Sequence, residues 1–340
     1  RIPGGLAHTN ILGNTLFGSL SGSSVAASVA IGGVLIPMEE KEGYDKKFAA
    51  AVNIASAPTG LIIPPSGILI IYPVLAGCSV VGMIMSGYIP GLMWALACMV
   101  VAYVIAKKNH YPTAGKVPAS VFFKYFVDAI PSLLLIVIIV GGVMSGIFTA
   151  TESAAVAVAY TLFLSIVVYR SIKIKDLPKI LLDACETTAV IMFLIAGSNV
   201  MSFVMTFTGL PSAIGNALIS VSSNKYVILL IINLVLLVVG CFMDITPAVL
   251  IFTPIFLPVV QSFGMDPIHF GIMMVMNLGI GNITPPVGSS LFSGCSVADM
   301  DMEDMIKPIL PFYAAIFVAL MLVAYVPWFS MALPTLFGAV

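Results

Sequence analysis

The chain has 340 residues, of which 60% are hydrophobic and only 9% are charged. An ordinary soluble domain has roughly 25% charged residues, so this composition excludes that class and is typical of a helical protein that crosses the lipid bilayer several times. The formal net charge of −1, without a basic patch between aromatic residues, excludes a nucleic-acid partner.

Two interrupted spans open the chain. The first covers residues 10–37 and is interrupted by the small residues at 18–24. Close helix packing is an alternative explanation of such a run. The second span, 48–75, is interrupted near residues 56–60 and again at Pro64-Pro65. Proline cannot continue a regular helix, so we expect the second span to be broken. We expect the same of the first because its counterpart in an internal repeat, residues 240–247, is also an interruption.

A charged loop separates these spans, and plainer ones follow them. The loop is predicted at 38–47, and the plainer spans at 80–106, 126–143 and 149–169. Glu152, at the start of the last, is a candidate intramembrane acid. A threonine three residues before a glutamate, at the start of an apolar run, is also the pattern of a capping box, and we favour that structural role for Thr149 and Glu152.

The next segment is predicted to fold back on itself. Residues 184–207 are apolar but contain Gly197-Ser198-Asn199, and a shorter segment begins at Gly209. Two half-length helices joined at a Gly-Ser-Asn tip would form a re-entrant hairpin, which we expect here. One ordinary span followed by an interfacial helix is the alternative.

A second pair of broken spans covers residues 226–260 and 270–296. The first is interrupted at 240–247 and the second at 282–288, where two prolines are adjacent. Breaking a helix at membrane depth leaves backbone groups without partners, which is tolerated only where they line a cavity or bind something. These breaks therefore mark a site. An acidic loop and a last span, 309–329, follow.

The two pairs of broken spans are copies of one another. Each motif of the first recurs 221 positions further on (258 minus 37, for example): Pro37, Gly43 and Pro64-Pro65 return as Pro258, Gly264 and Pro285-Pro286. Two such halves indicate a secondary transporter with its site at the repeat interface. The segment before the second pair maps upstream of residue 1, so we expect an N-terminal portion that this sequence does not include.

The basic residues between spans predict an orientation. Three basic connections, at 41–47, 107–116 and 170–179, are separated by two crossings each. The connections between them, near Gly77 and Gly146, have no lysine or arginine. The positive-inside rule therefore predicts that the three basic connections face the cytoplasm.

The polar groups at the breaks are serine, threonine, asparagine, one aspartate and freed backbone. Such an oxygen-rich site suits a hard cation such as Na+, and we expect at least two Na+ sites, one per repeat, and no organic cofactor. The candidate ligands are Ser21, Gly22, Ser24, Pro58 and Gly60 in the first, and Thr246, Gly279, Gly281, Asn282 and Thr284 in the second.

Asp244 is the one acid deep in an apolar span, which makes it a functional candidate. Its alternative role is an N-cap for the helix that follows. Half-helix N-termini favour an anionic solute, but a fixed carboxylate would repel a dianion and accept hydrogen bonds from hydroxyl groups. We therefore expect a mono-anionic, hydroxyl-rich solute. The residues predicted around it are Ser23, Pro65, Ser66, Asp244 and Pro286.

Other chemistries find little support. The three histidines are far apart in the sequence, the five cysteines form no C-x-x-C pair, and no nucleophile–base constellation or nucleotide-binding motif is present. The chain is therefore not expected to be an enzyme. An anion or ion channel built on the same repeats is the alternative function.

Several runs, in order along nearly the whole chain, resemble the large, DctM-like membrane subunit of tripartite ATP-independent periplasmic (TRAP) transporters. They are Gly4-Gly5-Leu6-Ala7-His8, Ser21-Gly22-Ser23-Ser24, Gly43-Tyr44-Asp45, Ile63-Pro64-Pro65-Ser66, Ser145-Gly146-Ile147-Phe148-Thr149-Ala150-Thr151-Glu152, Met243-Asp244-Ile245-Thr246-Pro247 and Asn282-Ile283-Thr284-Pro285-Pro286-Val287-Gly288.

That resemblance implies a multi-pass protein of the bacterial inner membrane, with an inverted-repeat fold of the elevator type, and a Na+-driven importer. Its partners would be a small membrane subunit, separate or fused, and a periplasmic binding protein that delivers the solute. A transport domain is implied at 1–76 and 184–298, and a scaffold at 77–183 and 299–340. Family solutes include dicarboxylates and sugar acids. The residues around Asp244 favour a sugar acid such as sialic acid over a C4-dicarboxylate.

Overall fold

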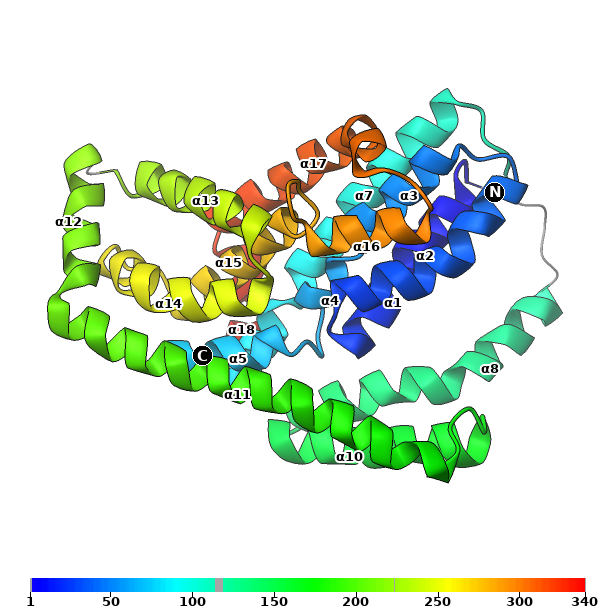
Figure 1. Ribbon diagram of the computed structural model, residues 1–340, viewed down its shortest axis with the longest axis horizontal. Helices are drawn as coiled ribbons and strands as arrows, with labels where there is room; N and C mark the ends of the chain where they lie inside the picture. Colours follow the sequence, from blue (N-terminus) through cyan, green and yellow to red (C-terminus); the bar gives the residue numbers. More distant parts are fainter. Residues whose placement is uncertain (1, 114–118, 223, 340) are drawn as a thin grey trace. The chain divides into compact units, whose positions relative to one another are not determined.

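The computed structural model describes residues 2–113, 119–222 and 224–339. Over these residues it is helical, without a strand, and seven helical stretches are long and apolar enough to span a membrane. The prediction of an all-α polytopic membrane protein is therefore confirmed (Figure 1). Of the basic connection predicted at 107–116, residues 114–116 lie outside the described part.

The chain divides into two compact units, one of Arg1–Ala114 with Val204–Val340 and one of Gly115–Phe203. The helices of the first unit are α1 (Gly5–Ser21), α2 (Ser24–Lys41), α3 (Lys46–Ser56), α4 (Thr59–Ile62), α5 (Ile68–Ala76), α6 (Val80–Ser86), α7 (Tyr88–Lys108), α12 (Leu210–Val221), α13 (Lys225–Phe242), α14 (Ile245–Ser262), α15 (Pro267–Gly281), α16 (Ser289–Val297), α17 (Met302–Tyr325) and α18 (Trp328–Leu336). Those of the second are α8 (Ala119–Ile136), α9 (Gly142–Met144), α10 (Ala150–Phe163) and most of α11 (Leu177–Thr208), with π-helical turns at Val137–Gly141 and Leu164–Val168 and a 3-10 turn at Ile174–Asp176.

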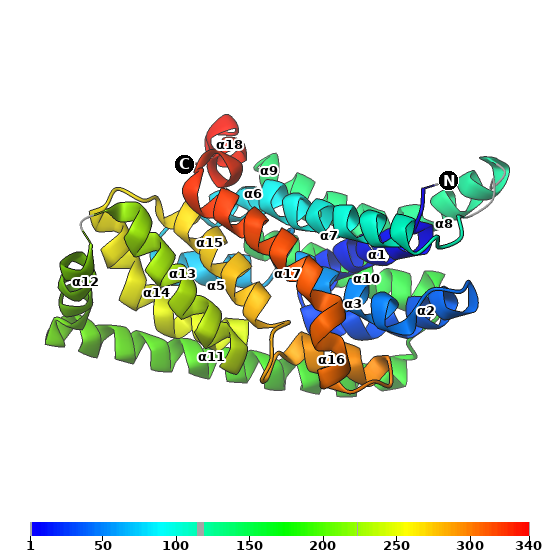
Figure 2. The ribbon, with the colours of Figure 1, turned by 90° about the horizontal axis from the view of Figure 1, so that it is seen from above.

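Helix α15 lies at the centre of the first unit. Every residue from Ile268 to Gly281 is buried, and the helix packs against α13, α14 and α17 (Figure 2). A helix buried on all sides has an apolar sequence around its whole circumference, as this one does apart from His269 and Asn277. The interruption that follows Gly281 therefore begins in the interior of the unit.

The breaks predicted in the first repeat are present. Helix α1 ends at Gly22, whose φ of 63° is left-handed, and α2 begins directly after Ser23. Helix α3 ends at Ser56, and Pro58 lies between it and the single turn of α4. The pair Pro64-Pro65 separates α4 from α5.

The breaks of the second repeat match them. Met243 and Asp244 separate α13 from α14, and residues 282–288 separate α15 from α16. In both repeats the peptide bond between the adjacent prolines is cis.

Helix α2 extends further than the sequence predicted. The predicted charged loop begins at residue 38, but the helix continues through Pro37 to Lys41. Glutamate and lysine are good helix formers, and the helix stops where Gly43 takes a φ of 87°. The extra turn places Glu39 in the interior of the unit.

The re-entrant hairpin predicted at 184–207 is not formed. Helix α11 is continuous from Leu177 to Thr208 and passes through Gly197-Ser198-Asn199 without a break. Each of these residues costs a helix only about 0.5–1 kcal/mol relative to alanine, and the apolar residues on both sides are sufficient to continue it. Helix α12 follows after Gly209, so the alternative of one span and a short second helix is the correct one.

The capping box at the start of α10 is confirmed. The Thr149 hydroxyl accepts a hydrogen bond from the backbone N–H of Glu152 at 3.3 Å, and the Glu152 carboxylate accepts one from the N–H of Thr149 at 2.9 Å. Glu152 therefore has the structural role that the sequence favoured.

Replacing Thr149 by alanine is expected to destabilise the first turn of α10 by about 1 kcal/mol, the usual loss for an N-cap. The amide of Glu152 should then exchange its hydrogen roughly five times faster, as followed by hydrogen–deuterium exchange. Thr151→Ala, a change of the same size in the same turn, is the control. Equal acceleration in both variants would contradict the cap.

Candidate functional site

In each repeat, a glycine of one helix packs directly against the backbone of a glycine of another helix. Gly18 of α1 faces Gly60 of α4, and a Cβ on Gly60 would lie 2.2 Å from the Gly18 Cα. In the second repeat Gly240 of α13 faces Gly281 of α15, and a Cβ on Gly281 would lie 2.4 Å from the Gly240 Cα. The positions Gly60 and Gly281 correspond in the repeat, so this contact belongs to both copies.

The two repeats meet at Pro58 and Gly279. These positions also correspond (279 minus 58 is 221), and a Cβ on Gly279 would lie 3.6 Å from the Pro58 Cβ. A position that contacts its own counterpart lies close to the axis that relates the two copies. The broken spans of both repeats therefore come together in the first unit.

A chain of polar side chains crosses this junction from the surface to the interior. The exposed Asp244 carboxylate accepts a hydrogen bond from the Ser289 hydroxyl at 2.6 Å, and Ser289 also contacts the amide oxygen of Asn282. The buried Asn282 amide donates to the hydroxyl of Ser24 at 2.7 Å and to that of Ser290 at 3.1 Å. Ser24 comes from the first repeat and the others from the second, so both contribute to one site.

Ser23 and Asp244 occupy equivalent positions before α2 and α14, but they have different roles. The Ser23 hydroxyl accepts a hydrogen bond from the Ala26 N–H at 3.2 Å and caps α2. Asp244 makes no side-chain cap at the start of α14 and bonds Ser289 instead. The N-cap alternative for its carboxylate is therefore wrong, and the carboxylate is accessible to a solute.

A second group of oxygens lies beside Gly22. Ser66 is 1% exposed, and its hydroxyl has no hydrogen-bond partner in the described part of the chain. A Cβ on Gly22 would lie 3.8 Å from the Ser66 Cα and 3.3 Å from the nitrogen of Gly67. An unpaired buried oxygen beside helix ends, which leave carbonyl groups without helical partners, fits a cation ligand. Ser66 was predicted beside the solute, and this environment makes it a candidate ligand of the cation instead.

A family model matches almost the whole chain. It is that of the tripartite ATP-independent periplasmic transporter, DctM component, and it covers residues 1–329. The chain belongs to this family. It is therefore a transporter subunit and not an enzyme, and its apolar helices are those of a multi-pass bacterial inner-membrane protein. TRAP subunits of this kind work with a small membrane subunit and a periplasmic binding protein.

Curated relatives agree with the family. The chain is 52% identical to the uncharacterized protein YgiK of Salmonella typhimurium, over 99% of this chain and 78% of that protein. It is 38% identical both to the C4-dicarboxylate TRAP transporter large permease protein DctM of Pseudomonas aeruginosa and to the sialic acid TRAP transporter large permease protein SiaM of Vibrio cholerae, each over 99% of this chain and 79% of the relative. The resemblance inferred from the motifs is confirmed.

Two aromatic side chains support the breaks in this TRAP subunit. The Trp94 indole of α7 donates to the Ala55 carbonyl at 2.9 Å. That carbonyl lies in the last turn of α3. Because the helix stops at Ser56, the carbonyl groups of this turn have no helical N–H to bond. The Tyr313 hydroxyl of α17 donates to the Ile283 carbonyl beyond the end of α15. Side chains from α7 and α17 thus replace the missing helical hydrogen bonds.

The predicted residues are distributed around this junction as follows. Gly22, between Ser21 and Ser23 in the chain, lies beside Ser66, which follows Pro65; Gly60 packs on Gly18; Pro58 contacts Gly279; Gly281 packs on Gly240; and Asp244, Asn282 and Ser24 belong to the polar chain. Pro286 is exposed, and Thr246 lies in the first turn of α14. The Thr284 hydroxyl donates to the Ile280 carbonyl at 2.6 Å.

Ser289 and Ser290 are site residues that the sequence reasoning missed. They are the first two residues of α16, and their counterparts in the first repeat are the apolar Ile68 and Leu69. A comparison of the two repeats could have identified them, because a pair of serines in the second repeat replaces a pair of apolar residues in the first.

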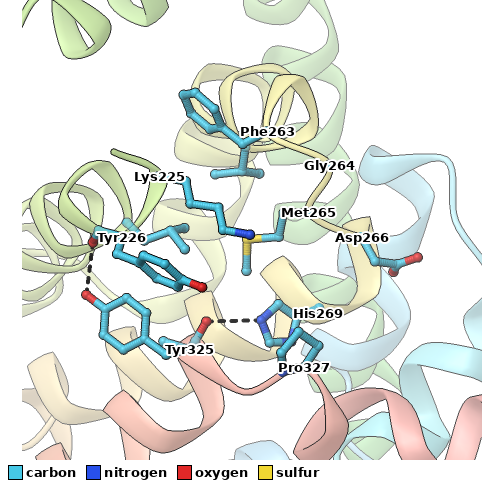
Figure 3. A pocket seen from close by; sticks show the side chains of 12 residues that line it. Lys225, Tyr226, Phe263, Gly264, Met265, Asp266, His269, Tyr325 and Pro327 are labelled. Carbon is cyan, nitrogen blue, oxygen red and sulfur yellow. Dashed lines mark hydrogen bonds between the residues drawn. The ribbon is translucent and has the colours of Figure 1, made fainter. Parts of the chain in front are cut away.

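A separate cavity of about 240 Å³ lies at the ends of α13, α14, α15 and α17 (Figure 3). Lys225, Asp266 and His269 are among its lining residues, and the Tyr325 hydroxyl donates to the Tyr226 carbonyl at 3.1 Å beside it. None of the predicted site residues lines this cavity. We assign it no part in the site.

Proposed function

We propose that this chain is the membrane subunit of a Na+-coupled importer of a small organic acid, with a sugar acid such as sialic acid favoured over a C4-dicarboxylate. The observation that carries the proposal is the polar chain from Asp244 to Ser24, which joins the two repeats where their helices break. In secondary transporters the solute and the coupling ions bind where such repeats meet.

Sodium is proposed as the coupling ion because the available ligands are oxygens. In the first repeat the buried Ser66 hydroxyl has no partner and lies beside Gly22. In the second, the Thr284 hydroxyl uses its proton toward Ile280, which leaves its lone pairs for a cation beside Asn282. Hydroxyl and carbonyl oxygens are the ligands that a small hard cation prefers where a helix unwinds.

The solute is inferred from the groups at the exposed end of the polar chain. The relatives do not decide it, since dicarboxylate and sialic acid permeases are equally similar to this chain. The Asp244 carboxylate can accept hydrogen bonds from several hydroxyl groups and repels a second negative charge. Ser289 adds a hydroxyl beside it. Both properties favour a hydroxylated mono-anion.

Transport is proposed to occur by sliding of a transport domain, 1–76 with 184–298, against a scaffold, 77–183 with 299–340. Within the first unit, α3 and α17 are joined by an ion pair between Lys47 and Asp304 at 2.6 Å, with both side chains about half exposed. An exposed pair is worth only about 0–1 kcal/mol, so its loss during sliding is a small barrier. The basic connections are proposed to face the cytoplasm.

Uptake by proteoliposomes tests the proposal. The chain is reconstituted with its small membrane subunit, the binding protein is supplied outside, and uptake of radiolabelled sialic acid, a hexonate and succinate is followed with inward Na+ or K+ gradients. We expect uptake of the sugar acids only with Na+ and the binding protein together. Equal uptake in K+ would overturn sodium coupling, faster succinate uptake would overturn the solute class, and single-channel current without the binding protein would favour the channel.

A further inference from the structure

Glu39 is a buried acid without a compensating charge. It lies in the last turn of α2, beyond the apolar span that ends at Pro37, and it is 0% exposed. One carboxylate oxygen accepts a single long hydrogen bond, 3.5 Å, from the Asn10 amide, and the other has no hydrogen-bond partner in the described residues. An ionised carboxylate is far more costly in such surroundings than a neutral carboxylic acid.

The groups around α2 do not neutralise this acid. The helix packs against α1, α3, α4 and α16. The titratable side chains on these elements and on the loop before α3 are His8, Glu42, Tyr44, Asp45, Lys46, Lys47 and Cys295, and Glu40 and Lys41 are on α2 itself. Among the described residues, the Lys46 amine lies 3.9 Å from the Glu40 carboxylate, and the Lys47 amine pairs with the Asp304 carboxylate. Neither lysine forms an ion pair with Glu39.

A buried chain of hydrogen bonds leads from Glu39 to the break in the first repeat. The Asn10 oxygen accepts a hydrogen bond from Asn14 at 3.0 Å. The Asn14 amide also lies 2.9 Å from the amide oxygen of Asn53 and 2.9 Å from the Ser56 hydroxyl. Ser56 is the last residue of α3. The acid is therefore connected, through side chains alone, to the place where α3 stops.

The second repeat shows that the fold does not need the acid. Glu39 corresponds to Val260 (260 minus 39 is 221). Gly18 and Gly240 make equivalent contacts, with Gly60 and Gly281, and by their offset (240 minus 18 is 222) Asn10 and Asn14 correspond to Ile232 and Leu236. All three of these apolar residues are 0% exposed. The second repeat buries an amide pair of its own, in which Asn277 donates to Asn233 at 2.8 Å. It has a valine where the first repeat has Glu39, so the acid is an addition to one copy.

We propose that Glu39 is a proton-binding site, at which one proton taken from the side of the basic connections neutralises the carboxylate and favours the conformation described here. The proton leaves water and forms an O–H bond on a carboxylate oxygen, and its release reverses this step. Nothing else is consumed or formed. A conformation in which water reaches the end of α2 would release the proton.

The direction of the pH effect follows from the burial. Burial raises the pKa of Glu39 to about 8, from an ordinary value of 4.5, and the hydrogen bond from Asn10 opposes this shift. The folded protein therefore holds a proton that the unfolded chain releases between these two values. The stability that this proton contributes is complete below about pH 4.5 and is lost as the pH rises to about 8.

Thermal unfolding of the purified transporter as a function of pH tests the site without any transport measurement. The wild-type Tm should fall between pH 5 and about 8, whereas Glu39→Gln, which imitates the protonated acid, should remove the part of this slope that one proton supplies. Glu40→Gln is the matched control, because Glu40 is the next residue, is part-exposed and lies beside Lys46. It should keep the wild-type slope. Equal slopes in wild type and Glu39→Gln would overturn the proposal.

Infrared spectroscopy gives a second readout on the wild type, should the variant fail to fold. A protonated carboxyl stretch is expected at neutral pH and should disappear above pH 9. Its absence throughout this range would also overturn the site. If the proposed function holds, uptake should depend on the pH of the compartment facing the basic connections, and Glu39→Gln should weaken that dependence. If uptake failed in every variant, the proposed function would be wrong, but the stability and infrared results would still decide whether Glu39 binds a proton.

Discussion

Replacing Gly60 by alanine is expected to destabilise the transporter by about 1–3 kcal/mol and to abolish uptake. The added Cβ would lie 2.2 Å from the Cα, 2.3 Å from the carbonyl carbon and 2.7 Å from the carbonyl oxygen of Gly18. All three are backbone atoms, which cannot rotate away as a side chain can. Helix α1 must therefore separate from α4, and the segment at Ser21–Ser24 must move with it.

Two further glycine variants make this test specific. Gly67→Ala is the control, because no atom lies within 4 Å of its added Cβ and its φ of −59° suits any residue. Gly281→Ala repeats the clash in the second copy, where the Cβ would meet Gly240. Thermal unfolding and uptake should be close to wild type for Gly67→Ala and reduced for the other two. Wild-type behaviour of Gly60→Ala would show that α1 and α4 are not in contact.

Replacing Asp244 by alanine is expected to reduce Na+-dependent uptake roughly 10- to 100-fold while the protein stays folded. A hydrogen bond to a charged group contributes about 1.5–3 kcal/mol, and each 1.4 kcal/mol corresponds to a factor of ten in binding. The folded state should tolerate the change because Asp244 is exposed and does not cap α14. Initial uptake rates in proteoliposomes, with Tm as the check on folding, measure both effects.

Asp301→Ala is the matched control for this variant. Asp301 is also an exposed aspartate directly before a helix, α17, and it also makes no side-chain cap. It lies away from the junction of the repeats, so uptake should remain at the wild-type level. Equal losses in the two variants would point to a general effect of acid removal, and wild-type uptake by Asp244→Ala would remove Asp244 from the site.

The breaks could be predicted from the sequence because their causes are local. A pair of adjacent prolines stops a helix whatever surrounds it, and the 221-residue repeat showed that Pro64-Pro65 and Pro285-Pro286 do so twice. The capping box between Thr149 and Glu152 is equally local. The break predicted at Gly197-Ser198-Asn199 failed for the converse reason, since small polar residues only weaken a helix and their neighbours decide the outcome.

The contacts of the site could not be predicted, because they join distant parts of the chain. Ser24 and Asn282 are 258 positions apart, and nothing in either local sequence indicates that a hydrogen bond joins them. The burial of Glu39 depends in the same way on tertiary packing. A glutamate followed by Glu40 and Lys41 has the sequence of a solvated helix end, yet the packing of α1 against α2 encloses its side chain.

The contact between Pro58 and Gly279 limits how the sequences of the two repeats can change independently. Elsewhere each half can accumulate substitutions by itself, but here a rigid ring in one copy lies against a bare α-carbon in the other, with the Trp94 ring 3.4 Å from where a Cβ of Gly279 would be. A Cβ at 279 would make only ordinary contacts, but a side chain larger than alanine would meet both rings, so it depends on a change at position 58 or at Trp94. At this single pair, the history of one half constrains that of the other.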